Sequence, residues 1–339
     1  MPGHNALNLM HIKYSGITVF LQGIALSATH ETRIVMAFQQ GGPMSTIAIA
    51  RAARPNFLVL APLCVMLGLG LVALQPVTLS AHDIVLVMVG ALLAHAAVNL
   101  LNEYEDFRSG LDLITRRTPF SGGSGALPET PSAAPLVRLA AMLTLSSVTA
   151  VGAYFLWLRG WPMLVIGLSG LGLVIAYTRW ITRMPWLCLL APGLGFGPVM
   201  VLGSLVALGG RIDAASFIVS GVALLLVSEL LLLNQFPDVE ADRRIGRRHL
   251  PIVLGLQGAS TIVVSLLLGA YVLIALGQIS GALPAGVWLA WLTLPAALWI
   301  VRRLPEALEA PELLLRVLGV NVATLLATLA LLGIGLWLA

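Results

Sequence analysis

Residues 234–248 read Asn-Gln-Phe-Pro-Asp-Val-Glu-Ala-Asp-Arg-Arg-Ile-Gly-Arg-Arg and follow directly on a long apolar run. Asn234, Asp238 and Asp242 are spaced at i, i+4 and i+8, so on a helix they share one face. Pro237 has no N–H donor and collides with the preceding turn, so the incoming apolar helix is predicted to kink or end here. The oxygen-bearing side chains then lie at a water-accessible mouth, where they suit a hard cation.

A second stretch earlier in the chain repeats this pattern. Residues 102–112 read Asn-Glu-Tyr-Glu-Asp-Phe-Arg-Ser-Gly-Leu-Asp, so that Asn102 is followed at i+4 by Asp106, with Asp112 six residues further on. One Asp-x-x-x-Asp pattern beside arginines is usually a solvated helical surface. Two Asn-x-x-x-Asp clusters, each at the end of an apolar helix, indicate two comparable half-sites instead.

The composition is that of a protein that crosses a membrane several times. Hydrophobic residues make up 58% of the 339 residues and charged residues only 10%, against roughly 25% charged residues in an ordinary soluble domain. A bilayer-spanning helix needs about 17–25 apolar residues. The predicted fold is an all-α integral membrane protein with about nine transmembrane helices, near residues 56–75, 83–102, 137–158, 161–178, 187–209, 214–235, 254–277, 284–301 and 313–338.

The distribution of basic residues predicts the orientation. Lys and Arg accumulate in the cytoplasmic loops of membrane proteins. Of the 19 Lys and Arg, Lys13 and Arg33 precede the membrane domain, and Arg159 and Arg211 fall in outer loops, which leaves 15 on the cytoplasmic side. Both clusters, and hence the active site, are therefore expected at the cytoplasmic face of a bacterial-type inner membrane. The net charge of +4 reflects this bias, and no nucleic-acid partner is expected.

The chain divides into two parts. Residues 1–43 contain no signal peptide in the usual order of basic, apolar and small residues, and they are interpreted as a disordered extension or as a misassigned start before Met44. Residues 44–339 form the membrane domain. Cys64 and Cys188 both fall in apolar segments, which favours buried small side chains over a disulfide or a metal pair.

Further polar residues are candidates for substrate contacts. Arg117 is followed by a glycine-rich stretch with Gly122, Gly123 and Gly125, whose backbone can approach a phosphate or simply form a flexible turn. Arg54 precedes the first apolar run and is either a topological anchor or a ligand for an anion.

Two ionisable residues lie within apolar segments. A charge at membrane depth is costly and is usually turned inward. Glu229 is therefore a candidate cavity residue, whereas His95 is expected to be a hydrogen-bonded interior side chain.

These clusters suggest a particular chemistry. Carboxylate and amide oxygens suit Mg²⁺, whose coordination is usually completed by water and substrate phosphates. Arginines suit phosphate oxygens. Together they specify a diphosphate, and the neighbouring apolar chamber specifies a lipid tail. Loss of the diphosphate leaves an allylic electrophile that must be kept from water, for which an electron-rich aromatic ring is the natural acceptor.

At these residues the chain resembles the UbiA superfamily of intramembrane prenyltransferases, from about Arg51 to the C-terminus. The resemblance implies nine transmembrane helices around a central cavity, with the two motifs on cytoplasmic loops. It implies that Mg²⁺ and the diphosphate are held by Asn102, Asp106, Asp112, Asn234, Asp238 and Asp242, with the four aspartates as the catalytic residues. It also places Tyr177, of a Tyr-Thr element, and Arg247 and Arg248 near the diphosphate, and Arg54 and Arg117 complete the expected substrate-binding set.

The six-residue step between Asp106 and Asp112 looks most like the 1,4-dihydroxy-2-naphthoate polyprenyltransferases of menaquinone synthesis. His249 stands where that branch commonly has Thr, and Arg179 with Trp180 replaces its Gly-Pro. The implied activity is Mg²⁺-dependent transfer from a polyprenyl diphosphate to an aromatic quinone precursor. The alternatives are a 4-hydroxybenzoate or other phenol acceptor, another lipid transferase or cyclase of the superfamily, and a transporter. The last is disfavoured because the acids lie on one side and are coupled to arginines.

Overall fold

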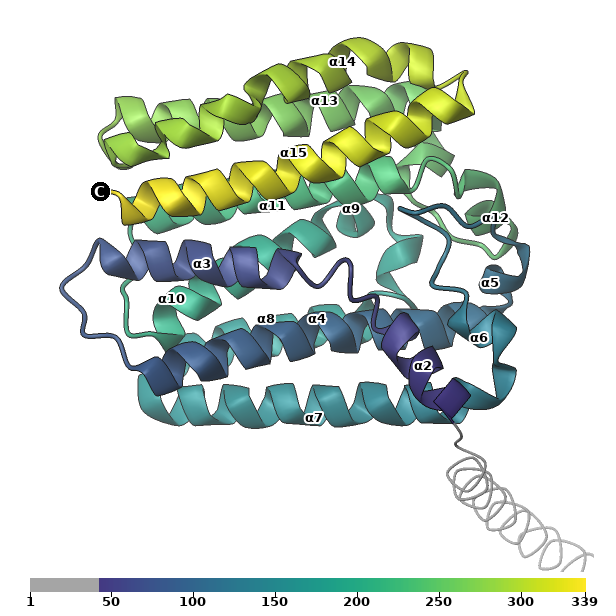
Figure 1. The fold of residues 1–339 in the computed structure, drawn as a ribbon, viewed down its shortest axis with the longest axis horizontal. Coiled ribbons are helices and arrows are strands. Elements are labelled where there is room, and N and C mark those ends of the chain that lie inside the picture. Colours follow the sequence, from purple (N-terminus) through teal and green to yellow (C-terminus); the bar gives the residue numbers. More distant parts are fainter. Residues whose placement is uncertain (1–42) are drawn as a thin grey trace, which may run out of the picture.

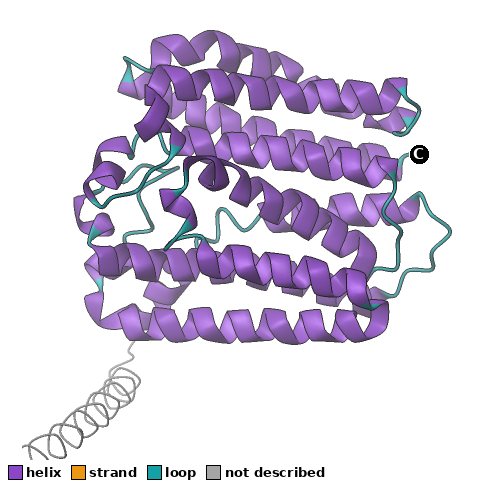
Figure 2. Ribbon diagram, turned by 180° about the vertical axis from the view of Figure 1, so that it is seen from behind, coloured by secondary structure: helices purple, strands orange, loops and turns teal. Residues whose placement is uncertain are grey.

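The computed structural model describes residues 43–339 (Figure 1). The extension expected over residues 1–43 lies outside the described residues, except for Pro43. All regular elements of the described part are helical (Figure 2). They are α2 (Pro43–Ala52), α3 (Leu60–Ala73), α4 (Ala81–Ser109), α5 (Leu111–Ile114), α6 (Ala126–Glu129), η1 (Pro131–Ala133), α7 (Ala134–Arg159), α8 (Trp161–Ala176), η2 (Ile181–Arg183), α9 (Pro185–Leu194), η3 (Gly195–Leu202), α10 (Gly203–Ala207), α11 (Ala214–Asn234), α12 (Val239–Arg244), α13 (Leu250–Ile279), η4 (Ala285–Thr293), α14 (Leu294–Ala307) and α15 (Pro311–Trp337).

Seven helical segments of the described chain are long and apolar enough to cross a membrane: Ala81–Ser109, Pro131–Arg159, Pro185–Ala207, Ala214–Asn234, Leu250–Ile279, Ala285–Ala307 and Pro311–Trp337. The other two predicted spans form the shorter apolar helices α3, of 14 residues, and α8, of 16 residues. At 1.5 Å per residue these are about 21 and 24 Å long, less than the roughly 30 Å hydrocarbon layer. The protein is therefore an all-helical integral membrane protein, and the count of nine spans stays a prediction.

Local sequence sets the ends of the two helices that carry the motifs. Helix α4 begins at Ser80, whose side chain accepts a hydrogen bond from the backbone of Asp83, and it ends at Gly110, which adopts a φ of 79° that few other residues tolerate. Helix α11 begins with a capping box between Asp213 and Ser216. Both N-terminal caps lie at the end of the bundle opposite the motifs.

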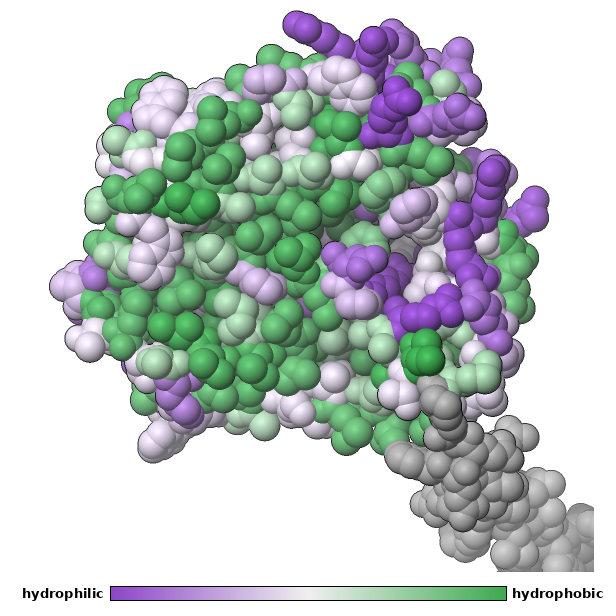
Figure 3. Space-filling model, in the orientation of Figure 1, coloured by the Kyte–Doolittle hydropathy of each residue, from purple (hydrophilic) through white to green (hydrophobic). Residues whose placement is uncertain are grey.

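The helices pack into two halves around a shared middle (Figure 1). Helices α4, α7 and α8 lie side by side in one half, and α13, α14 and α15 lie in the other, with α11 packed against α9, η3, α13 and α15. The short helices α5, α6 and α12 gather at one end of the bundle. Figure 3 shows that hydrophilic residues are concentrated at this end, whereas the flank of the bundle is largely hydrophobic.

The half formed by α13, α14 and α15 is tightly joined. Gly286 and Gly335 bring the backbones of η4 and α15 so close that an added Cβ on either residue would meet the backbone of the other, a contact typical of membrane helices. The Tyr271 hydroxyl lies 2.8 Å from that of Thr293, which lies 2.7 Å from that of Thr328. This chain of hydroxyls connects α13, η4 and α15 inside the apolar core.

Candidate active site

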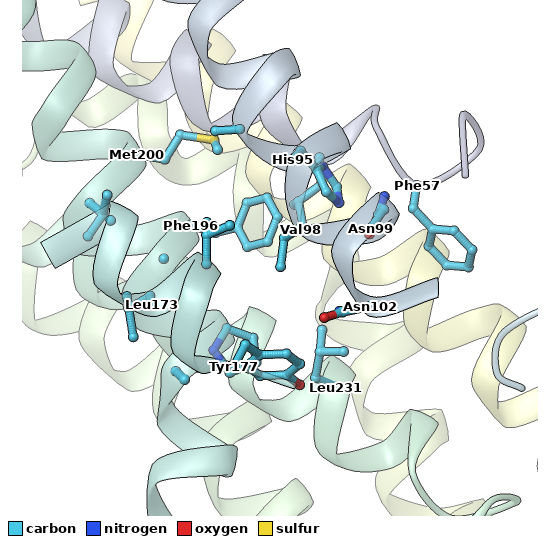
Figure 4. A pocket seen from close by; sticks show the side chains of 18 of the residues that line it. Phe57, His95, Val98, Asn99, Asn102, Leu173, Tyr177, Phe196, Met200 and Leu231 are labelled. Atoms are coloured by element: carbon cyan, nitrogen blue, oxygen red, sulfur yellow. The ribbon is translucent and has the colours of Figure 1, made fainter. Parts of the chain in front are cut away.

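One cavity, of about 560 Å³, runs along the middle of the bundle and reaches the polar end. Its sides are formed by α3, α4, α7, α8, α9, η3, α10, α11 and α15 and are mostly apolar. Figure 4 shows Tyr177, Asn102 and Leu231 around one part of it and Phe196 and Met200 around another. All six predicted metal-binding residues line it, together with Arg54, Tyr177 and Arg247: Asn102, Asp106, Asp112, Asn234, Asp238 and Asp242.

The first motif is built from the end of α4 and the start of α5. Asn102 and Asp106 are one turn apart on α4, and the Thr178 hydroxyl donates to Oδ1 of Asn102. The left-handed Gly110 then ends α4 and lets the chain turn into α5, which returns Asp112 to the cavity. The six-residue step between the two aspartates is therefore a helix end followed by a new helical turn.

The second motif differs from the single helical face that the spacing predicts. Helix α11 ends at Asn234, Asp238 lies in the following turn, and α12 begins only at Val239. The break confirms the effect expected of Pro237, which can neither donate to the helix ladder nor fit behind the preceding turn. The three residues therefore do not share one helical face, but the turn still presents Asp238 and Asp242 to the cavity that Asn234 lines.

Arg247 joins the two motifs. Its Nη2 donates to Oδ1 of Asp106, and its Nη1 donates to Oδ1 of Asp242 at 2.9 Å. The other carboxylate oxygen of Asp242 lies 2.8 Å from Nε2 of His249, which is buried. One acid of each motif therefore already has a cationic partner.

Three other motif residues each carry a side-chain oxygen without a partner. Oδ2 of Asp112, Oδ1 of Asn234 and Oδ1 of Asp238 are buried and have no hydrogen-bond partner in the described chain. Burial raises the pKa of Asp112 to about 7, and burial followed by the nearby Asp242 charge raises the pKa of Asp238 to about 7. Buried oxygens normally have partners, so these three atoms form a candidate ligand site.

These oxygens fit Mg²⁺, which prefers hard oxygen donors. Among residues 43–339, no group of three or more His, Cys, Asp or Glu side chains is arranged to hold a metal ion. Asp112, Asn234 and Asp238 offer two carboxylates and one amide, so Mg²⁺ would need water and phosphate oxygens to complete its usual octahedral coordination. The residues present therefore suit a metal that arrives with a phosphorylated substrate.

Glu103 holds neighbouring parts of the site in place, a role that the sequence did not reveal. Its side chain is fully buried and accepts hydrogen bonds from the backbone N–H of Ser124 at 3.0 Å and from the Ser124 hydroxyl at 2.5 Å. Nη2 of Arg54 also donates to it, at 3.4 Å. Through these hydrogen bonds, Glu103 connects Arg54 and the glycine-rich loop at Ser124 to α4. Its position next to Asn102 turns it about 100° away from the motif face, which is why the spacing did not select it.

The other predicted arginines occupy different positions. Arg117 lies outside the cavity lining, where its Nη1 pairs with Glu129 at 2.8 Å, and Arg51 pairs with the same carboxylate at 2.5 Å. These two hydrogen bonds lower the pKa of Glu129 to about 2. Arg248 is exposed, and its backbone N–H donates to the carbonyl of Thr182 at 3.0 Å. Substrate contacts by Arg117 and Arg248 stay predictions.

Glu229 and His95, the two ionisable residues within apolar segments, both differ from their predicted environments. Glu229 is fully buried beside α15, where Nδ2 of Asn321 donates to it at 2.9 Å, and it does not line the cavity. His95 lines the cavity and makes no hydrogen bond within residues 43–339. Both expectations were wrong, because periodicity does not tell which neighbour a buried polar side chain meets.

Gly123 offers a test of how closely Asp112 is held. A Cβ added there would lie 2.6 Å from Oδ1 of Asp112, and the φ of 76° disfavours other residues. We expect Gly123→Ala to shift the carboxylate and to lower turnover about a hundredfold, the usual scale for misplacement by 1 Å. The measurement is product formation per purified enzyme. Gly172→Ala on α8, where an added Cβ meets nothing within 4 Å, should match the wild type; equal activity of both variants would show that Asp112 need not stay in place.

Comparisons with known proteins agree with this arrangement. Residues 59–311 match the UbiA prenyltransferase family. The chain is 28% identical over 212 residues to a 1,4-dihydroxy-2-naphthoate octaprenyltransferase of Bacillus subtilis (strain 168), an alignment that covers 61% of this chain and 66% of the relative.

Solved structures share the fold. A digeranylgeranylglyceryl phosphate synthase superposes with a TM-score of 0.62 at 15% identity, over 87% of this chain and 99% of the other. A UbiA homolog from Archaeoglobus fulgidus bound to GPP and Mg²⁺ gives a TM-score of 0.55 at 17% identity, over 84% and 99%. At these identities the likeness concerns the fold.

Proposed function

The chain belongs to the UbiA prenyltransferase family, and we propose that it transfers a polyprenyl group from a polyprenyl diphosphate to an aromatic quinone precursor, with 1,4-dihydroxy-2-naphthoate as the favoured acceptor. The acceptor assignment is supported by the dihydroxynaphthoate octaprenyltransferase relative and by the six-residue step in the first motif. The reaction would belong to menaquinone-type quinone synthesis.

One observation carries the proposal of diphosphate chemistry. Two motifs more than a hundred residues apart converge on one end of an apolar cavity, and there they leave three buried oxygens without partners, those of Asp112, Asn234 and Asp238. These atoms and the arginines Arg54 and Arg247 provide the mixed charge that a metal-bound diphosphate requires. A free anion would be repelled by the carboxylates and a free cation by the arginines.

The polar end of the cavity would bind the diphosphate, and its apolar sides would bind the polyprenyl tail. Asp112, Asn234 and Asp238 would hold Mg²⁺ with the diphosphate. When bound, Mg²⁺ supplies Lewis-acid stabilisation of the negative charge on the departing group. Arg247, already placed between the motifs, and Arg54 contribute positive charge at the same end. The apolar sides take the polyprenyl tail and exclude water while the C1–O bond breaks and the C1–ring-carbon bond forms, after which the ring loses a proton.

The proposed location follows from the substrate. A polyprenyl diphosphate lies in the bilayer with its headgroup at the surface, so the polar end of the bundle should sit at one membrane face. The basic residues concentrated in the loops of that end favour the cytoplasmic face of a bacterial-type inner membrane.

The rival acceptor is 4-hydroxybenzoate or another phenol. One of the solved structures with this fold is a digeranylgeranylglyceryl phosphate synthase, whose name is that of a lipid synthase. Fold similarity therefore does not identify the acceptor. A lipid transferase or cyclase is therefore the second rival, and transport is the most distant one.

Product mass distinguishes these rivals. Membranes containing the protein, and control membranes without it, are supplied with Mg²⁺, a polyprenyl diphosphate and either dihydroxynaphthoate or 4-hydroxybenzoate. We expect a prenylated naphthoate product that disappears on chelation of Mg²⁺ with EDTA. A prenylated hydroxybenzoate alone moves the assignment to the phenol branch. Released diphosphate without a prenylated ring contradicts aromatic transfer and favours another acceptor or cyclisation.

A further inference from the structure

Polar side chains that line the cavity along the spanning helices differ in whether they are already hydrogen-bonded. Thr149 on α7 donates to the carbonyl of Leu145 on the same helix at 2.9 Å, and Ser204 on α10 donates to the carbonyl of Met200 in the preceding η3 at 2.7 Å. Asn99 on α4 donates to the carbonyl of Ala53 at 2.9 Å. His95, only 7% exposed, makes no hydrogen bond to any residue of the described chain, and its Nδ1 is buried without a partner. Buried polar atoms seldom lack partners, so His95 is prepared for a ligand.

His95 lies at a definite depth relative to the diphosphate end. On α4, His95, Asn99, Asn102 and Asp106 follow at i, i+4, i+7 and i+11, so all four share one face, and all four line the cavity. The seven residues from His95 to Asn102 correspond to about 10 Å of helix rise. The reacting carbon and the acceptor must fit into this interval, immediately beyond the diphosphate.

The imidazole is held in place by an aromatic neighbour. The ring of Phe196, from η3, meets it edge to face, with ring centroids 4.8 Å apart and planes inclined at 75°. Figure 4 shows both rings at the cavity, together with Asn102 and Tyr177. This contact fixes the ring orientation but uses neither nitrogen as a hydrogen-bond donor or acceptor.

We propose that His95 binds the aromatic acceptor by accepting a hydrogen bond from one of its ring hydroxyls. The inference rests on the proposed function and deepens it. A polyprenyl tail offers no donor, and the diphosphate is an acceptor that belongs at the other end of the interval. A hydroxylated ring is the substrate that combines an apolar body with a donor, and a neutral imidazole has one nitrogen free to accept it. His95 therefore selects hydroxylated rings and orients them toward the prenyl carbon.

The test measures acceptor binding separately from turnover. Purified protein in detergent is titrated with dihydroxynaphthoate, without Mg²⁺ or prenyl diphosphate, and with an analogue whose hydroxyls are methylated. We expect His95→Leu to weaken dihydroxynaphthoate binding about tenfold, the scale of one buried hydrogen bond, and His95→Gln, which keeps an acceptor, to recover part of it. Methylation should weaken binding to the wild type by a similar factor but should not further weaken binding to His95→Leu.

Ser204→Ala is the matched control, because Ser204 is buried at the cavity but already hydrogen-bonded to the carbonyl of Met200. The acceptor affinity of this variant should equal that of the wild type. In steady-state assays, the KM for the acceptor should rise in His95→Leu while the KM for polyprenyl diphosphate stays constant. A change in the diphosphate KM with unchanged acceptor affinity would place His95 along the tail and overturn the inference.

The remaining outcomes separate this inference from the proposed function. Hydroxyl-dependent binding that requires His95, with no prenylated product, supports the acceptor site and contradicts the transfer reaction. If the wild type and His95→Leu both form prenylated product and bind the acceptor with the same affinity, the transfer reaction is supported. The role of His95 is then overturned. Reduced thermal stability of both His95 variants with unchanged affinity also overturns it, because the side chain then serves packing alone.

Discussion

Asp238→Asn is expected to lower prenyl transfer about a thousandfold while leaving the protein folded. The substitution keeps the shape of the side chain but removes a charged ligand, and the bound metal should contribute several kcal/mol to stabilising the departing diphosphate. Oδ1 of Asp238 is buried without a partner, and burial raises the pKa of the carboxyl to about 7. A neutral amide at this position should therefore be tolerated by the fold, and the loss should appear in turnover and in Mg²⁺ dependence.

Glu240→Gln is the control for this variant. Glu240 lies two residues further on, its side chain is 75% exposed, and it pairs with Arg243 at 3.3 Å. Its removal should leave activity near the wild-type level, since exposed pairs contribute little. Single-turnover product formation over a range of Mg²⁺ concentrations provides the measurement. If Asp238→Asn retained more than a tenth of wild-type turnover at every Mg²⁺ concentration, the assignment of Asp238 to the metal would fail.

Arg247→Gln should have the largest effect on stability. Arg247 is the shared partner of Asp106 and Asp242, whose side chains are only 13% and 4% exposed. Removing one member of a buried ion pair leaves an uncompensated charge and typically costs about 3–5 kcal/mol. We therefore expect a lower unfolding midpoint in detergent, together with loss of turnover.

Mg²⁺ should restore part of the stability of Arg247→Gln, because a cation bound between the motifs replaces some of the missing charge. Arg243→Gln is the control: its side chain is 53% exposed in an i, i+3 pair with Glu240, so its removal should cost at most about 0.5 kcal/mol. Equal unfolding midpoints for the two variants would mean that Arg247 does not hold the motifs together.

Much of the site could be predicted because its signals are local. The Asn-x-x-x-Asp spacing selected residues that all line the cavity, and Pro237 correctly marked the end of α11. Apolar length and composition gave helices at all nine expected places, although α3 and α8 are too short to establish the full number of spans. The family resemblance placed Arg247 near the diphosphate, and Arg247 does line the cavity.

The remaining features depend on contacts between distant parts of the chain. Arg247 bridges to Asp106 across 141 positions, which no spacing rule reports. Glu103 hydrogen-bonds to Ser124, 21 residues further along the chain. Arg117 lies outside the cavity lining and pairs with Glu129. His249 appeared in the sequence as a departure from the family pattern, and the structure shows why it is accommodated: it hydrogen-bonds Asp242.

The two halves of the bundle contribute differently to the cavity. In the described chain, α13 and α14 contribute no residue to the cavity, and their half is joined by the close contact of Gly286 with Gly335 and by the hydroxyl chain from Tyr271 to Thr328. Helices α7 and α8 supply much of the apolar lining. We therefore expect substitutions on α7 and α8 to change the length of prenyl chain that the cavity accepts, and substitutions on α13 and α14 to change mainly the stability of the fold.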